Sequence, residues 1–267
     1  MSSVVARGIR AGYREREVLR GVELVAHAGE LVALVGQNGA GKSTLLRVLG
    51  GLLRPASGSV TIDGVDVTAL DRRSIARHIA VVPQVFETLF PFTVREIVAL
   101  GRTSRLGPLG TLGSDDARAV ARALDDIGAT DLADRRIDRV SGGERQRAVL
   151  AMALAQEAGV LLLDEPTAHL DPTHQRGTLE RVATLARLRG LAVVAVLHDL
   201  NLAAAFATRV VLLADGAVVR EGEPTQVITP DLVASVFGPG LRVVTHGGRP
   251  FVIPEPATAL ERHARAG

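Results

Sequence analysis

A glycine-rich loop between a short hydrophobic run and a predicted helix constrains this chain more than any other feature. Leu31–Val35 is followed by the sequence GQNGAGKST and then by the apolar run Leu45–Leu49. The pattern G-x-x-x-x-G-K-S in this strand–loop–helix setting is typical of a loop whose backbone N–H groups turn toward phosphates. The residues predicted to bind phosphate are Gly36, Gln37, Asn38, Gly39, Ala40, Gly41, Lys42, Ser43 and Thr44. The loop therefore predicts an α/β core with a nucleotide site.

The usage of basic residues supports a specific role for Lys42. The chain has 31 basic residues, and Lys42 is the one lysine among them. A compact ammonium can reach phosphate oxygens inside a tight loop, where a forked guanidinium fits poorly. A chance glycine turn with a solvated lysine is the alternative, and the complete match with its flanking elements argues against it. We expect Lys42 to bind the β- and γ-phosphates and the Ser43 hydroxyl to bind Mg²⁺.

Several further hydrophobic runs are continuous rather than alternating and lie between predicted helices. They are Ile79–Val82, Val160–Leu163, Ala192–Leu197 and Val210–Leu213. Strands of this kind are buried on both faces, which favours a parallel sheet covered by helices. Two more strand-like segments, Val60–Asp63 and Val218–Glu221, adjoin the turn dipeptides Asp63-Gly64 and Asp215-Gly216, which predict hairpin edges.

The chain from about residue 90 to residue 158 differs from the sheet-forming segments around it. Apart from a Gly/Pro-rich loop at 101–113 it reads as helix, with a capping box at Thr93 and Glu96 and another helix start at Ser114. We expect a helical lobe inserted into an α/β lobe, with residues 1–267 forming a single domain. The tail from about 241 carries a predicted strand pair, Leu241–Thr245 with Pro250–Ile253, and ends in a polar helical stub at 257–266.

Two adjacent carboxylates follow the predicted strand at Val160–Leu163. Asp164 and Glu165 lie at the edge where α/β sheets bind ligands. An acidic turn after a strand is common by itself, but together with the phosphate loop this pair indicates catalysis. We expect Asp164 to hold Mg²⁺ and Glu165 to act as the general base for a water molecule near the γ-phosphate.

The composition excludes several classes of site and partner. The absence of cysteine excludes disulfides, iron–sulfur clusters and thiolate zinc sites. Aromatic residues make up 3% of the chain and the net charge is only +2, so we expect no nucleic-acid partner. The longest apolar runs fall short of the ~20 residues of a membrane-spanning helix. Because the first residues also lack the layout of a signal peptide, we expect a soluble protein that stays where it is made.

A second predicted anion site begins at Ser141. The segment Ser141-Gly142-Gly143-Glu144 opens a predicted helix that runs to Ala155, and Ser141 with Glu144 forms a capping box. An ordinary capped helix is the alternative. Here the sequence resembles the nucleotide-binding domains of ABC transporters, whose signature motif reads L-S-G-G-Q. In this chain Val140 and Glu144 stand at the first and last positions of that motif.

The resemblance extends over nearly the whole chain. It implies a P-loop NTPase fold of ABC type, with a RecA-like core sheet, an antiparallel edge sheet and an inserted helical lobe. It also implies that adenine stacks on Tyr13 and that Gln84 contacts Mg²⁺ and the attacking water. His198 would sense the γ-phosphate, and the loop Ala168-His169-Leu170-Asp171 would make a dimer contact at the nucleotide.

The same resemblance implies how such a protein works. Two copies would bind two ATP molecules head to tail, each with Mg²⁺, and Ser141, Gly142 and Gly143 of one copy would complete the phosphate site of the other. Hydrolysis would drive transport through separate membrane permease subunits and, indirectly, an external substrate-binding protein. The chain would then be peripheral, at the cytoplasmic face of the cell membrane.

Local segments resemble one branch of the family, the importers of ferric siderophores, haem and cobalamin. These segments are Phe90–Val94, Gly101-Arg102, His198–Asn201, Gly222–Pro224 and Ile228–Asp231. Three alternatives stay open: an ATPase of another transporter branch, a soluble ABC-type ATPase of DNA repair or translation, and a nucleotide-gated scaffold. The sequence has one cassette and no coiled-coil heptads, and an intact Glu165 and His198 favour hydrolysis over a pure switch.

Overall fold

The central element of the fold is a six-stranded sheet in the order β10–β9–β3–β8–β7–β6. This computed structural model describes residues 2–14, 16–88, 90–107, 110–168 and 170–255. The strands are β3 (Leu31–Val35), β6 (Ile79–Val82), β7 (Val160–Asp164), β8 (Ala192–Val196), β9 (Arg209–Ala214) and β10 (Ala217–Gly222). All pairs are parallel except β9 with β10. The predicted parallel sheet and its antiparallel hairpin at Asp215-Gly216 are confirmed.

Both faces of this sheet are buried, as the continuous hydrophobic runs predict. Along β3, the side chains of Leu31, Ala33 and Val35 belong to one hydrophobic core. The alternating residues Val32 and Leu34 belong to a second core on the opposite face. A strand with two buried faces has no position for a polar side chain, which explains why β3 carries none.

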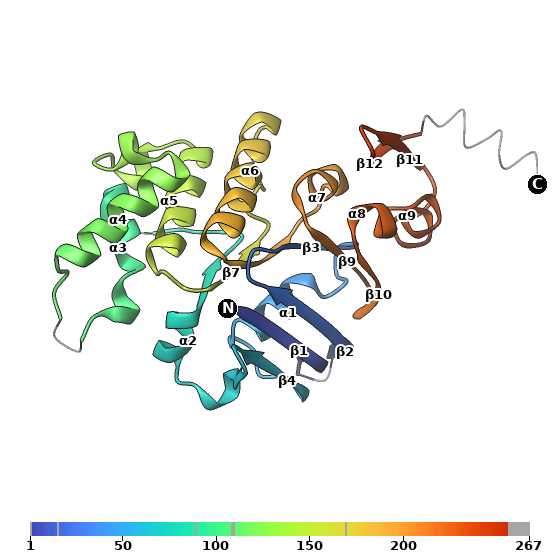
Figure 1. Cartoon of the computed structure of the whole chain (residues 1–267), viewed down its shortest axis with the longest axis horizontal. Helices are drawn as coiled ribbons and strands as arrows, with labels where there is room; N and C mark the ends of the chain where they lie inside the picture. Colours follow the sequence, from blue (N-terminus) through green and yellow to red (C-terminus); the bar gives the residue numbers. More distant parts are fainter. Residues whose placement is uncertain (1, 15, 89, 108–109, 169, 256–267) are drawn as a thin grey trace, which may run out of the picture.

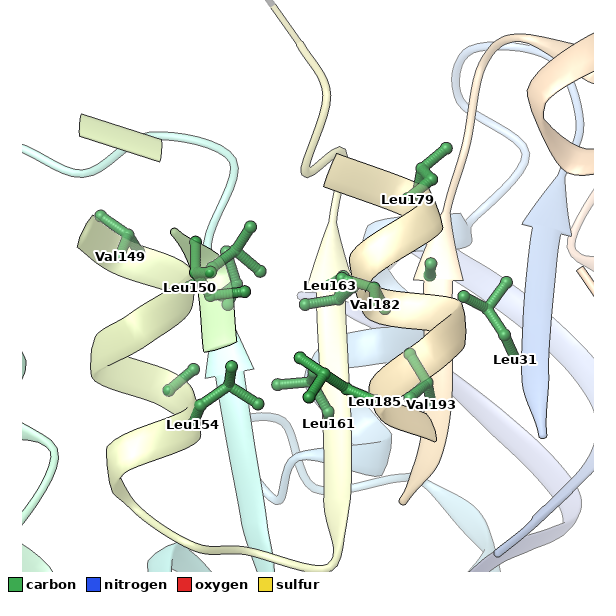
Figure 2. Close-up of a cluster of buried hydrophobic side chains, with 14 of the residues drawn as sticks. Leu31, Val149, Leu150, Leu154, Leu161, Leu163, Leu179, Val182, Leu185 and Val193 are labelled. Carbon is green, nitrogen blue, oxygen red and sulfur yellow. The ribbon is translucent and has the colours of Figure 1, made fainter. Parts of the chain in front are cut away.

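The first core joins the sheet to the long helices. Leu161 and Leu163 of β7 lie between side chains of α5 (Gly142–Ala155) and side chains of α6 (Pro172–Arg189), as Figure 2 shows. The facing residues are Val149, Leu150 and Leu154 on α5 and Leu179, Val182 and Leu185 on α6. The helix that begins at the Ser141 motif and the strand that ends at Asp164 thus share one hydrophobic core.

The second core lies between the central sheet, α1 (Lys42–Leu49) and an antiparallel sheet ordered β2–β1–β4–β5. Its strands are β1 (Ser3–Tyr13), β2 (Arg16–His27), β4 (Ser57–Ile62) and β5 (Val65–Asp66). β4 and β5 confirm the hairpin predicted at Asp63-Gly64. The long β1 and β2 were not predicted as individual strands, because register shifts between Ala6 and Gly12 interrupt their alternation.

The helical lobe contains α3 (Val94–Leu100), α4 (Ser114–Ile127) and α5, which lie together at the left of Figure 1. The capping box of Thr93 with Glu96 and the helix start at Ser114 are confirmed. The prediction of continuous helix after residue 113 is wrong for residues 128–141. Gly128 ends α4 in the left-handed conformation, and the chain then forms only the 3₁₀ turns η3 (Thr130–Leu132) and η4 (Ile137–Arg139).

The C-terminal part lies at the end of the molecule away from the helical lobe (Figure 1). It comprises α7 (Leu200–Phe206), α8 (Pro224–Val227), α9 (Pro230–Phe237) and a hairpin of β11 (Leu241–His246) with β12 (Arg249–Pro254). The predicted strand pair is thus confirmed, whereas the predicted stub at 257–266 lies outside the described residues. The remaining elements are α2 (Arg72–His78), η1 (Val67–Ala69) and η2 (Thr103–Arg105). Within the described ranges, every helix is too short or too polar to cross a membrane.

Candidate functional site

Four neighbouring strands of the central sheet each end at a residue that the sequence singled out. β3 leads into the glycine-rich loop, β8 leads to His198, β7 ends at Asp164 and β6 leads to Gln84. The strands are parallel, so their carboxyl ends meet at one edge of the sheet. Segments from four distant parts of the chain are therefore brought together by topology alone.

The glycine-rich loop is shaped to bind an anion. Gly41 precedes α1 in the left-handed conformation, with φ of 102°, and no side-chain hydrogen bond caps this helix end. The first turn of α1 contains no acidic residue, so none of its own side chains neutralises the positive end of the helix dipole. At Gly36, a Cβ atom would lie 2.0 Å from the backbone oxygen of Leu213, which requires glycine there.

Lys42 is held inside this loop. Its side chain is only 6% exposed, and its Nζ donates to the backbone oxygens of Gly36 and Gln37, each at 2.8 Å. Burial lowers the pKa of Lys42, while the nearby Glu165 and Asp164 carboxylates oppose that shift. An ammonium fixed at the centre of the loop can donate to phosphate oxygens without first being ordered.

Ser43 and Asp164 form a pair of hard oxygen ligands. The Ser43 hydroxyl donates to Oδ1 of Asp164 at 2.9 Å. Burial raises the pKa of Asp164, and the Ser43 hydrogen bond counteracts that shift. A hydroxyl and a carboxylate side by side next to a phosphate loop are the donors that Mg²⁺ prefers, so these residues fit the predicted metal.

Glu165 occupies a constrained position between two polar side chains. Its Oε2 accepts a hydrogen bond from Nε2 of Gln84 at 2.7 Å, and its Oε1 lies 2.5 Å from Nε2 of His198. The backbone of Glu165 is left-handed, with φ of 51°. A non-glycine residue in this conformation stores strain that the surroundings must offset, a feature that clusters at functional sites. The three predicted catalytic residues are therefore in direct contact.

Several of these groups border a cavity of about 450 Å³, whereas Gln84 and Asp164 line a separate one. Lys42, Ser43 and Thr44 line one part of the 450 Å³ cavity, and Glu165 and His198 line another. Tyr13 lines the cavity, and its hydroxyl accepts a hydrogen bond from Nη1 of Arg47 at 2.9 Å, while the stacking of adenine on its ring stays a prediction. Of the predicted phosphate loop, Asn38, Gly39 and Gly41 also lie on its wall.

Two cavity residues, Arg16 and Val18, were missed by the sequence reasoning. Arg16 pairs with Tyr13 across the β1–β2 hairpin, and Val18 follows on the same strand. The only signal that could have found them is this register, which places both near Tyr13. Recognising it would have required β1 and β2 to be predicted first.

The family model described as ABC transporter matches residues 19–168, more than half of the chain. The match includes the glycine-rich loop, Gln84, the Ser141 motif and the carboxylate pair. This chain belongs to the ABC transporter family.

Curated ABC transporter relatives match most of the chain. The cobalamin import ATP-binding protein BtuD of Halobacterium salinarum is 47% identical over 85% of this chain, which spans 57% of that relative's length. The hemin import ATP-binding protein HmuV of Nocardia farcinica is 47% identical over 90% of this chain and 83% of its own length.

Solved ABC structures share the fold. An inward-facing metal-chelate type ABC transporter has a TM-score of 0.83 at 28% identity and covers 97% of this chain and 99% of its own. A dimeric ATP-binding cassette, MJ0796, solved in a post-hydrolysis state with ADP and Pi, has a TM-score of 0.72 at 30% identity, over 83% of this chain and 98% of its own. The predicted ABC-type fold is confirmed.

The ABC signature segment lies apart from the cavity lining. Ser141 caps α5. The Ser141 N–H donates to Oε2 of Glu144 at 2.7 Å, and the Glu144 N–H donates to Oγ of Ser141 at 3.3 Å. Neither Ser141 nor Gly142 or Gly143 is among the residues that line the cavity. A Cβ atom on Gly142 would meet no atom within 4 Å, so this helix end is open.

The loop before α6 lies next to the signature segment. A Cβ atom on Gly143 would lie 3.5 Å from Cδ2 of Leu170, so the two loops share one surface. Asp171 caps α6, accepting from the N–H groups of Thr173 and His174 at 3.0 Å each. His169 lies outside the described residues. A nucleotide or dimer contact by Asp171 stays a prediction.

Proposed function

We propose that this chain is the ATP-hydrolysing subunit of an ABC importer and that it works as a head-to-tail dimer. The observation that carries the proposal is the position of Glu165. Its carboxylate is held between Gln84 and His198 and lines the same cavity as Lys42. A carboxylate fixed in this way beside a phosphate loop is suited to orient and deprotonate a water molecule.

The remaining residues divide the binding of ATP among them. Lys42 and the N–H groups of the first turn of α1 would hold the β- and γ-phosphates. Tyr13 would offer its ring to adenine. Arg16 lines the same cavity and adds a second cation to that of Lys42. Ser43 and Asp164 would hold Mg²⁺, which when bound neutralises phosphate oxygens as negative charge builds up.

The separation of the signature segment from the cavity supports a dimer. Ser141, Gly142 and Gly143 present an open helix end away from the cavity wall of their own chain. A second copy arranged head to tail would place this end against the γ-phosphate of its neighbour. The dimeric state of the related cassette MJ0796 is consistent with this arrangement.

An exposed apolar surface supports a membrane partner. Leu52 and Val85 are 58% and 64% exposed and line one cavity together with Gln84, and Phe90, which precedes α3 of the helical lobe, is 66% exposed. Large apolar side chains left exposed next to each other indicate a protein partner. We assign this surface to a separate permease subunit, so the chain would lie at the cytoplasmic face of the membrane and would be linked indirectly to an external binding protein.

The cargo class follows from the relatives. The names of the matched importers refer to cobalamin, hemin and metal chelates, which share a metal held in a large organic ligand. We propose a cargo of this class: an iron chelate, haem or cobalamin.

The test is uptake in cells that lack this chain, complemented with the wild type or with Glu165→Gln. Radiolabelled cobalamin, haem and a ferric siderophore would be supplied in turn, and ATP turnover would be measured on the purified protein. We expect one cargo to accumulate with the wild type only, and turnover to fall about 10²- to 10⁴-fold in Glu165→Gln, because a general base is lost. Unchanged turnover would remove Glu165 from its role, and no uptake of any of the three would refute the cargo class.

A further inference from the structure

The C-terminal hairpin β11–β12 is attached to α7 at both ends of that helix. In the first turn of α7, Nδ2 of Asn201 donates to the backbone oxygen of Val252 at 3.0 Å, and the Val252 N–H donates to Oδ1 of Asn201 at 2.7 Å. At the last turn, Nη1 of Arg249 donates to the backbone oxygens of Ala204 and Ala205. The hairpin therefore holds α7 at its start and at its end.

Apolar packing reinforces these hydrogen bonds. Val252 is 9% exposed and belongs to the same hydrophobic core as Ala203 and Ala204 of α7. Figure 1 shows the hairpin beside α7 at the end of the molecule away from the helical lobe. The two-stranded sheet makes no ladder with the central sheet. Its fixed position thus depends on side-chain contacts such as those with α7.

The helix held in this way begins next to His198. Asp199 caps α7 by accepting from the N–H groups of Asn201 and Leu202 at 2.7 and 3.2 Å. Asn201 therefore takes part in the helix cap through its backbone and in the hairpin contact through its side chain. His198 is the residue before this cap and reaches Oε1 of Glu165 at 2.5 Å. A shift of the first turn of α7 would move His198 relative to Glu165.

We propose that the β11–β12 hairpin positions His198 against Glu165 through α7, and that Asn201 and Arg249 are the positioning residues. This inference rests on the proposed ATPase function. Small displacements of catalytic groups reduce turnover strongly. The groups proposed to bind ATP, Lys42 on α1 and Tyr13 at the end of β1, lie on other elements. The hairpin should therefore affect turnover without affecting nucleotide affinity.

The test compares Asn201→Leu and Arg249→Met with the control Arg242→Met in the full chain. Arg242 lies on β11 and is exposed, and no side-chain hydrogen bond joins it to another described residue. We expect each positioning variant to lower kcat about threefold to tenfold, the effect of one or two hydrogen bonds, with KM for ATP unchanged. The control should match the wild type.

A second background separates positioning from a general loss of stability. In a His198→Ala chain, Asn201→Leu and Arg249→Met should cause no further loss in single-turnover hydrolysis, because the residue through which they act is gone. A further loss of the same size in that background, or unchanged kcat in the wild-type background, would overturn the proposal.

Hydrogen exchange provides a readout that does not require turnover. Residues 200–206 should exchange faster in Asn201→Leu and Arg249→Met than in the wild type, while residues 36–49 of the phosphate loop and α1 should not change. Faster exchange in both segments, or in neither, would also overturn the proposal. If the wild type hydrolyses no ATP, the proposed function fails instead. If His198→Ala hydrolyses ATP at the wild-type rate, the positioning of His198 is overturned while the proposed function stands.

Discussion

Arg102 is a buried cation whose removal should destabilise the helical lobe measurably. Arg102 is 5% exposed and follows Gly101, the residue that ends α3. Its Nε donates to Oδ1 of Asp116 at 2.8 Å, and its Nη1 donates to Oε2 of Glu157 and to the backbone oxygen of Ala155 at 2.7 Å. One guanidinium thus connects the end of α3, the first turn of α4 and the end of α5.

The loss in the free energy of unfolding depends on which partners of Arg102 the substitution Arg102→Met would leave unpaired. Removing one member of a buried ion pair costs about 3–5 kcal/mol. Glu157 is 39% exposed and keeps Arg122 at 2.8 Å, so its share of the loss is small. The Ala155 oxygen loses its partner, and Met preserves the apolar stem. We therefore expect the low end of that range, about 3 kcal/mol.

Urea denaturation followed by circular dichroism, together with thermal melting, would measure this loss. For a chain of this size, about 3 kcal/mol corresponds to a fall in Tm of roughly 6–12 °C. The matched control is Arg118→Met, because Arg118 pairs with Asp115 on the surface and both side chains are more than half exposed, at 62% and 84%. The control should cost less than about 1 kcal/mol. A loss below about 1 kcal/mol in Arg102→Met as well would refute the account of the buried guanidinium.

Two further variants test the nucleotide site. Lys42→Ala should raise the Kd for ATP by at least about tenfold in a calorimetric titration, because charge-assisted hydrogen bonds to phosphate are lost; an unchanged Kd would contradict the phosphate-loop assignment. Asp164→Asn should melt at a higher temperature than the wild type at pH 7 without nucleotide. Burial raises the pKa of the Asp164 carboxyl in the folded state above the ordinary 3.8 that it has in the unfolded chain. The wild type therefore loses stability as pH rises from the unfolded-state pKa through the folded-state pKa. The amide of Asn does not titrate, so Asp164→Asn avoids this loss. The gain should shrink as pH falls toward 3.8, and a variant less stable than the wild type at pH 7 would show that Asp164 stabilises the fold.

The sequence predicted the central sheet because burial on both faces leaves an unmistakable pattern. Leu31–Val35 and Val160–Leu163 are short continuous hydrophobic runs, which are typical of a strand covered on both sides. The residues at their ends, Lys42 and Asp164, could therefore be placed at one edge before any coordinates were known. β1 and β2 left no such pattern, since bulges break their alternation and they carry exposed arginines.

The contacts within the site could not be predicted to the same extent. The motif residues Gln84, Glu165 and His198 could be identified, but their mutual contacts depend on the strand order β8–β7–β6. The missed residues Arg16 and Val18 depend on the register of a hairpin that the pattern did not reveal. The family resemblance predicted a dimer contact at the nucleotide for Asp171, whereas the hydrogen bonds that the structure shows for its carboxylate cap α6. Tertiary pairing, rather than local sequence, decides the first two, whereas the Asp171 cap is a local contact and its predicted role stays a prediction.

The most direct test of the proposed dimer is the molecular mass of Glu165→Gln in solution with saturating ATP and Mg²⁺. Light scattering after size exclusion should give twice the 28.0 kDa of one chain with nucleotide and a single chain without it. Ser141→Arg in the same background should stay single, because the open helix end is blocked. A Glu165→Gln protein that binds ATP yet remains at 28.0 kDa would contradict the claim that two copies complete each other's nucleotide site.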